Sequence, residues 1–186
     1  AHQPVGNFHE VVDDAHRRCY RPFIETLHRY PDFKFTVHFS GWLLDFLLAH
    51  FPQDMALLHA MVARGQAELF GAGDTEPVLA VIPNRDRIGQ VKTLSDKLEK
   101  KLGARPKGAW LTERVWEATV VPALVDAGID YVTVDDYHFL CTGKRIEELN
   151  GFYTTEEDGR RLDLFPISEA LRYRLPFSPA DEAVRY

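Results

Sequence analysis

Segments with helical periodicity alternate along the chain with short strand-like segments, and this order constrains the fold more than any other feature. The expected helices cover 11–30, 42–50, 55–63, 84–102 and 120–127, and the expected strands cover 34–39, 66–70, 109–111, 131–134 and 161–165. Such alternation implies an α/β fold with a mainly parallel sheet, either doubly wound or closed as a barrel. A doubly wound nucleotide binder has a glycine-rich phosphate loop after its first strand. Since no such loop is present, we expect a barrel.

The clearest helix is the one expected over 84–102. Its apolar residues fall on one stripe, lysine and glutamate occupy the opposite side, and Gly103 follows the last turn. The helix expected over 11–30 contains Pro22, which should bend it. At Asp158-Gly159 a turn precedes the strand expected over 161–165. From Ser178 a further helix is expected, with Ser178 as its N-cap and Pro179 as its first residue.

Composition limits the function classes. The 186 residues are 45% hydrophobic, which suits one globular domain, and the formal charge of −6 argues against a nucleic-acid partner. No apolar run approaches the roughly 18 residues that span a bilayer, so no membrane partner is expected. Cys19 and Cys141 lie far apart and read as free thiols of a reducing compartment, which favours a cytoplasmic location. No cofactor motif was found.

Both ends of the sequence resemble interior positions of a longer protein. The stretch 2–8 reads like the loop that follows a strand, and the helix expected from Ser178 has little room before Tyr186. We therefore expect 1–186 to be a single, incomplete domain, with part of the chemistry outside it.

Polar residues follow each expected strand, where a (β/α) barrel places its working residues. The strand exits deliver His2-Gln3-Pro4, His38-Phe39-Ser40, Glu68 with Glu76 further on, the stretch 110–117, and Asp135-Asp136-Tyr137-His138. One acid after a strand is more often a helix cap than a catalyst. Five such exits together predict a site.

Glu113 is the sharpest candidate, because it lies between Trp110 and Trp116. Tryptophan rings stack on sugar rings, and glycoside hydrolysis needs two carboxyl groups, one of them a nucleophile in retaining enzymes. The alternative is a buried ion pair between Glu113 and Arg114 that supports packed tryptophans. The residues alone leave both interpretations open.

Other functions also remain open at this stage. Asp135, Asp136 and His138 are spaced as in a metal-dependent polysaccharide deacetylase. A non-catalytic glucan-binding role is a third hypothesis, and stoichiometric zinc or glucan turnover would separate the three. His38 has no close second ligand in the sequence, so we expect a hydrogen-bonded histidine at the rim of the site rather than a metal ligand.

Four blocks, taken together and in order, are similar to glycoside hydrolase family 57, with the closest likeness to its 4-α-glucanotransferase and α-amylase members. The blocks are His2-Gln3-Pro4, Gly65-Gln66-Ala67-Glu68, the Trp-Leu-Thr-Glu-Arg-Val-Trp run 110–116, and the run 134–139. The resemblance covers essentially the whole chain. It implies a (β/α)7-barrel catalytic domain, here partial and truncated at both ends, that acts on α-1,4-glucans with retention.

The resemblance also implies roles for individual residues. Glu113 matches the catalytic nucleophile, and His2, Glu68 and Trp110 match residues that line the donor subsites. We add Trp116, Asp136 and His38 as expected substrate-binding residues, with no metal and no cofactor. The general acid/base of the family is an aspartate in a later block that does not occur before Tyr186, so the chain alone is expected to be inactive. A maltooligosaccharide, amylose, starch or glycogen is the expected partner, and a homodimer is conceivable for the full-length protein.

Overall fold

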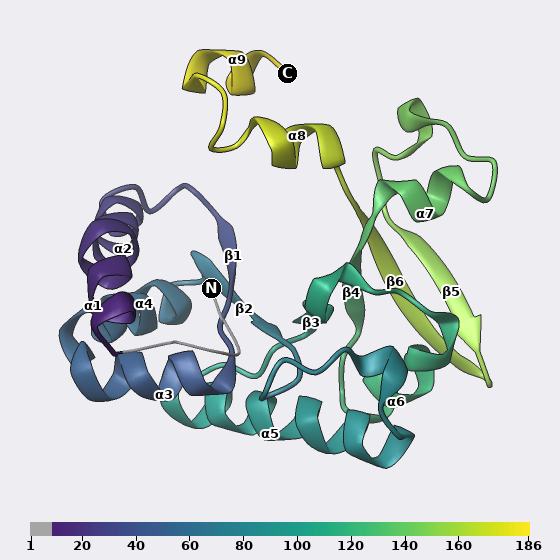
Figure 1. The fold of residues 1–186 in the computed structure, drawn as a ribbon, viewed down its shortest axis with the longest axis horizontal. Coiled ribbons are helices and arrows are strands. Elements are labelled where there is room, and N and C mark those ends of the chain that lie inside the picture. Colours follow the sequence, from purple (N-terminus) through teal and green to yellow (C-terminus); the bar gives the residue numbers. More distant parts are fainter. Residues whose placement is uncertain (1–8) are drawn as a thin grey trace.

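The computed structural model describes residues 9–186, and its centre is a six-stranded sheet (Figure 1). The strand order is β1-β2-β3-β4-β6-β5, in which every neighbouring pair is parallel except β5 and β6. The strands are β1 Phe35–His38, β2 Ala67–Gly71, β3 Gly108–Ala109, β4 Tyr131–Asp135, β5 Tyr153–Glu157 and β6 Arg160–Ile167. The expected α/β fold with a mainly parallel sheet is confirmed.

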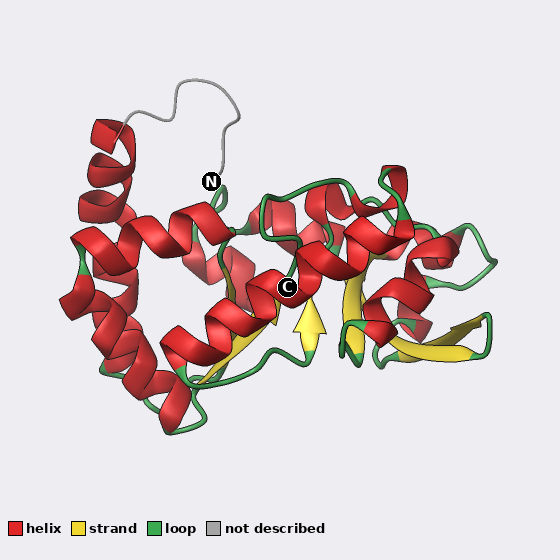
Figure 2. Ribbon diagram, turned by 90° about the horizontal axis from the view of Figure 1, so that it is seen from below, coloured by secondary structure: helices red, strands yellow, loops and turns green. Residues whose placement is uncertain are grey.

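Helices occupy the connections between the parallel strands. They are α1 His9–Ala15, a π-helical turn His16–Tyr20, α2 Arg21–His28, α3 Gly41–His50, α4 Pro52–Ala63, α5 Asn84–Leu102, α6 Val121–Asp126, α7 Asp136–Leu140, α8 Glu169–Arg174 and α9 Ala180–Arg185. In Figure 1, α3, α5 and α6 form a row along one side, and α8 and α9 lie on the opposite side. From the side of that row, Figure 2 shows the helices crossing the strands.

Two helices follow closely from their sequences. The helix α5 has the predicted bounds, and Gly103, with φ 81°, caps its end in the left-handed conformation that glycine adopts without strain. The helix predicted over 11–30 is one helical run interrupted by the π turn His16–Tyr20, in which Arg21 N–H donates to His16 O. Pro22 lies in the first turn of α2 and would clash with the carbonyl four residues earlier, so the wider π turn accommodates it.

The strand expected over 161–165 and the turn expected at Asp158-Gly159 are confirmed as β6 and the turn before it. Two details differ from expectation: the cap of the last helix lies one residue later, and β6 pairs antiparallel with β5, a strand that was not predicted. Asp158 and Gly159 form the turn with φ 50° and 74°, but the polar residues that follow Tyr153 in β5 gave no strand signal. At the C-terminus, Pro179 occupies the N-cap position of α9 and Ser178 precedes it.

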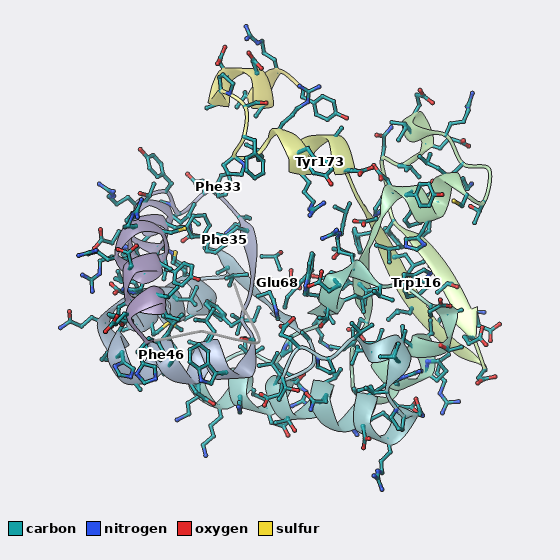
Figure 3. All side chains as sticks on the ribbon, in the orientation of Figure 1. Phe33, Phe35, Phe46, Glu68, Trp116 and Tyr173 are labelled. Carbon is teal, nitrogen blue, oxygen red and sulfur yellow. The ribbon has the colours of Figure 1, made fainter. Side chains whose placement is uncertain are left out.

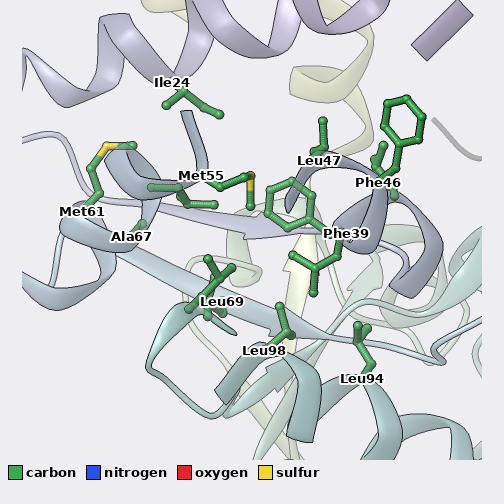
Figure 4. Close-up of a cluster of buried hydrophobic side chains, with 14 of the residues drawn as sticks. Ile24, Phe39, Phe46, Leu47, Met55, Met61, Ala67, Leu69, Leu94 and Leu98 are labelled. Carbon is green, nitrogen blue, oxygen red and sulfur yellow. The ribbon is translucent and has the colours of Figure 1, made fainter. Parts of the chain in front are cut away.

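The hydrophobic core lies on the helix-covered face of the sheet. One cluster packs β1 and β2 against α3 and α4 through residues such as Phe39, Leu47, Met55, Met61 and Leu69 (Figure 4). A second cluster packs β4 and β6 against α5 and α6 through Val91, Leu124, Val132, Val134 and Leu162. Because strand side chains alternate, the residues between these positions, such as Glu68, Phe70, Tyr131 and Asp135, share the other face.

None of the helices formed by residues 9–186 is long and apolar enough to cross a membrane.

Candidate active site

The parallel strands bring four chain segments together at one edge of the sheet. We call this the carboxyl edge; it is marked by His38, Gly71, Ala109 and Asp135, the last residues of β1 to β4. The opposite ends of these strands are called the amino edge. In parallel α/β sheets, ligands bind at the carboxyl edge. The candidate site is built from the residues at the ends of these strands and in the segments that follow them along the chain.

Glu76, in the loop after β2, links two other strand exits. Its Oε1 lies 2.5 Å from Nε2 of His38, and its Oε2 accepts a hydrogen bond from the Thr112 hydroxyl at 3.2 Å. The His38 ring lies nearly parallel to the Trp110 ring, with 6.5 Å between centroids. Glu76 therefore joins β1, its own loop and the segment after β3. The expectation that His38 is a hydrogen-bonded histidine at the rim is confirmed.

Glu113 lies in a tight turn, Thr112–Arg114, directly after β3. Glu113 and Arg114 have φ angles of 55° and 57°, in the left-handed region. For residues with a Cβ, this conformation costs about 1–2 kcal/mol each. Arg114 N–H donates to Leu111 O at 2.8 Å, and Arg114 Nε donates to Asp135 Oδ2 at 2.9 Å. The turn is thus held on one side by the Thr112–Glu76 contact and on the other by the Arg114–Asp135 ion pair.

The Glu113 side chain itself is exposed. Among residues 9–186 its carboxylate has no hydrogen bond or ion pair. The expected alternative, an ion pair between Glu113 and Arg114, is wrong because Arg114 pairs with Asp135. An open carboxylate on a constrained turn is suited to nucleophilic attack.

The two tryptophans flank this turn and are half-buried. Trp110 packs against the cluster around α3 and α4, and Trp116 packs against the cluster around α5 and α6. Each ring is therefore supported from behind while part of it remains accessible. That arrangement is compatible with a sugar platform.

Asp136 and Asp135 differ in their surroundings. Asp136 is only 8% exposed, and its Oδ2 accepts a hydrogen bond from Glu169 N–H at the start of α8. The described contact therefore ties α7 to α8, and a substrate contact of Asp136 stays a prediction. Sequence reasoning gave Asp135 no role in the glucan site, because nothing in its spacing shows that it faces Arg114, 21 residues earlier.

Glu68 does not lie at a strand exit, contrary to expectation. It is the second residue of β2, on the face of the sheet away from the hydrophobic clusters (Figure 3). Its Oε1 accepts a hydrogen bond of 2.5 Å from the Tyr131 hydroxyl. Burial and this hydrogen bond raise the pKa of Tyr131. The pair spans β3 at Gly108, where a Cβ would lie 2.3 Å from the Tyr131 ring.

Gln66, in the same sequence block as Glu68, has a structural role. It is 1% exposed, and its amide nitrogen donates to the carbonyl oxygens of Leu27, Tyr30 and Phe33. These contacts hold the loop that leads into β1. Within the block Gly65–Glu68, Gln66 therefore holds the loop before β1, and Glu68 places a carboxylate on the face of the sheet opposite the hydrophobic clusters.

Two further expectations concern His2 and a metal. His2 lies outside the described residues. Residues 9–186 contain no group of three histidine, cysteine or acidic side chains arranged to hold a metal ion. Asp135 and Asp136, two of the three ligands considered for a deacetylase, are occupied by Arg114 and by Glu169 N–H.

Comparison with known proteins identifies the family of the chain. The family model of glycosyl hydrolase family 57 matches residues 5–186. A 4-alpha-glucanotransferase of Thermococcus kodakarensis is 49% identical over 100% of this chain and 28% of its own length. An alpha-amylase of Pyrococcus furiosus is 47% identical, with the same 100% and 28% coverage.

Solved structures give the same result. The crystal structure of 4-alpha-glucanotransferase from Thermococcus litoralis superposes with a TM-score of 0.93 at 48% identity, over 100% of this chain and 29% of that one. A polysaccharide deacetylase from Mycobacterium smegmatis, with a TM-score of 0.60 at 15% identity over 88% of this chain and 55% of that one, shares the fold alone. The chain belongs to glycosyl hydrolase family 57, and it spans about 28% of the length of the curated relatives it matches.

Proposed function

We propose that this chain is the part of a retaining α-1,4-glucan enzyme, a 4-α-glucanotransferase or α-amylase, that supplies the nucleophile Glu113. The observation that carries the proposal is the open carboxylate of Glu113 on a left-handed turn held from both sides. The names of the relatives support the substrate class, and their two activities leave hydrolysis and transfer as alternatives.

In the proposed reaction, a Glu113 carboxylate oxygen attacks the anomeric carbon of the glucan, and the glycosidic C–O bond breaks. A second carboxyl group protonates the leaving oxygen, and a glycosyl ester of Glu113 forms. Water or a sugar hydroxyl, deprotonated by the second group, then attacks the anomeric carbon and releases Glu113. We assign this second group to the whole protein outside the chain, because Glu76, Asp135 and Asp136 all have partners within it.

The substrate contacts follow from where each residue lies. Trp110 and Trp116 are proposed to stack on sugar rings, and His38 lies at the same edge. Contacts from His2, Glu68 and Asp136 stay predictions from the family resemblance. The cytoplasmic location and a homodimer of the whole protein also stay predictions.

The test uses Glu113→Gln in the whole protein. The amide keeps the shape of the side chain but cannot form the ester, so turnover should fall at least ~10³-fold while glucan binding is retained. Glu117→Gln, a nearby exposed carboxylate, is the matched control and should retain turnover. A variant Glu113→Gln that keeps more than a small fraction of kcat would show that Glu113 is structural.

An activated donor identifies the nucleophile directly. The fluoride ion of a glycosyl fluoride leaves without protonation, so the glycosyl group should be transferred to the nucleophile even when the general acid is removed. Mass spectrometry should find the ester on the peptide that contains Glu113. A label on Glu68 or Asp136 instead would refute the assignment.

A further inference from the structure

Glu76 has no role in the proposed reaction, yet its carboxylate contacts both His38 and Thr112 at the start of the Glu113 turn. We propose that Glu76 is a positioning residue that holds His38 and the Thr112–Arg114 turn in their working arrangement. This inference rests on the proposed function of Glu113. Each oxygen of the Glu76 carboxylate has its own partner, Nε2 of His38 or the Thr112 hydroxyl.

The loop that presents Glu76 is built rigidly. Glu76 has φ 58°, so the chain retains a side chain where glycine would be unstrained. Thr75 N–H donates to Oε1 of Gln90 on α5 at 2.9 Å, and Glu76 N–H donates to Gly73 O at 3.0 Å. A Cβ at Gly73 would lie 2.5 Å from Pro77, so the loop closes around a position that only glycine fits. The loop that carries the Glu76 carboxylate is therefore held in one conformation by these contacts.

The contact with His38 orients its ring. An ionised carboxylate only accepts hydrogen bonds, so the proton of His38 lies on Nε2. Nδ1 of His38 is buried and has no hydrogen-bond partner among the described residues. Glu76 is thus the hydrogen-bond partner in residues 9–186 that sets the tautomer of His38 and the orientation of its ring.

The contact with Thr112 reaches Glu113 through one peptide bond. Thr112 is 9% exposed, and its hydroxyl donates to Oε2 of Glu76. Since Glu113 and Arg114 are held in a conformation of raised energy, loss of this contact lets the turn relax and moves the nucleophile. A displacement of about 1 Å at a reacting group can cost ~10²-fold in rate.

The experiment measures glycosylation by a glycosyl fluoride, together with glucan affinity and thermal unfolding, in the whole protein. Glu76→Gln should slow glycosylation about 10–10²-fold with glucan affinity changed less than about threefold. Thr112→Val, which removes only the hydroxyl, should slow it about tenfold, and Thr112→Ser should restore it. A purely structural role would not give this split between rate and affinity with rescue by serine.

The matched control is Thr154→Val on the hairpin. Thr154 donates the same kind of hydrogen bond to the Asp163 carboxylate at 2.6 Å, away from the carboxyl edge, and its loss should leave glycosylation unchanged. Wild-type glycosylation in both Glu76→Gln and Thr112→Val would overturn the inference. If Glu76→Gln fails to fold, the Thr112 pair decides alone. Turnover retained in Glu113→Gln would instead refute the proposed function, so the two failures are distinguishable.

Discussion

The two edges of the parallel sheet place different residues in the same backbone conformation. At the amino edge, left-handed φ angles belong to glycines: Gly65, Gly103 and Gly128 end the helices that precede β2, β3 and β4. At the carboxyl edge they belong to Glu76, Glu113 and Arg114. Glycine adopts this conformation without a steric cost, whereas a residue with a Cβ does not.

The polar contacts differ in the same way. At the amino edge, the Gln66 amide donates to three backbone carbonyl oxygens, and its role is to stabilise the fold. At the carboxyl edge, Glu76 and Asp135 hold a turn whose residues are strained. In the connections of β1 to β4, side chains are therefore kept in left-handed positions only at the carboxyl edge, where the candidate site lies, and glycines take these positions at the amino edge. Asp158, in the turn between β5 and β6, is a left-handed residue outside these connections.

The largest effect on stability is expected at the amino edge. Gln66→Leu keeps the side-chain volume but removes the amide that donates to the carbonyl oxygens of the segment before β1 and accepts from Arg64, at a cost of about 3 kcal/mol. Thermal unfolding of the whole protein measures the loss. Gln53→Leu, on the exposed side of α4, is the control and should change stability little. Equal effects of the two substitutions would contradict a special role for Gln66.

The next effect is expected at the carboxyl edge, on rate. Asp135→Asn removes the charge that holds Arg114, and a hydrogen bond between charged groups is worth about 1.5–3 kcal/mol. We expect kcat to fall about 10–10²-fold with a small change in glucan affinity. Asp130→Asn breaks the Lys107–Asp130 pair at the amino edge and should leave kcat unchanged. If both variants lower kcat equally, the two edges do not differ as described.

Backbone strain should change the free energy of unfolding by about 1 kcal/mol at either edge. Gly65→Ala should destabilise by that amount because its φ is 68°, although nothing lies within 4 Å of a new Cβ. Gly151→Ala, where the space is also open and φ is not left-handed, is the matched control. At the carboxyl edge, Glu113→Gly should be more stable than Glu113→Ala by a similar amount. Thermal unfolding of all four variants tests this, and an alanine variant as stable as the glycine one would exclude strain at Glu113.

The smallest effect is expected in the helical layer, away from both edges. Burial lowers the pKa of His16 below its ordinary 6.5, an effect that Asp54 and Asp13 oppose and Arg21 reinforces. As the pH falls below the ordinary pKa of histidine, His16 takes up a proton more readily in the unfolded chain than in the folded one, so the free energy of unfolding should decrease. His16→Gln should flatten this dependence between about pH 7.5 and 5.5. Parallel stability curves for wild type and variant would argue against the titration of His16.

Local patterns in the sequence determined most of the elements. The stripe in 84–102 and the following glycine predicted α5 with its bounds, because helical periodicity and capping depend on neighbouring residues. The four family-like blocks identified the family and singled out Glu113. The hairpin arm β5 was missed because its few apolar residues become a strand only by pairing with β6.

Only the tertiary structure decided how the site is held. Arg114 has Glu113 as its neighbour in sequence but pairs with Asp135, and Glu76 meets His38 across 38 positions. The left-handed conformation of Glu113 likewise depends on anchors from β4 and from the loop after β2. Such contacts are set by which strands are adjacent and by which face each side chain points to, so no local pattern in the sequence encodes them.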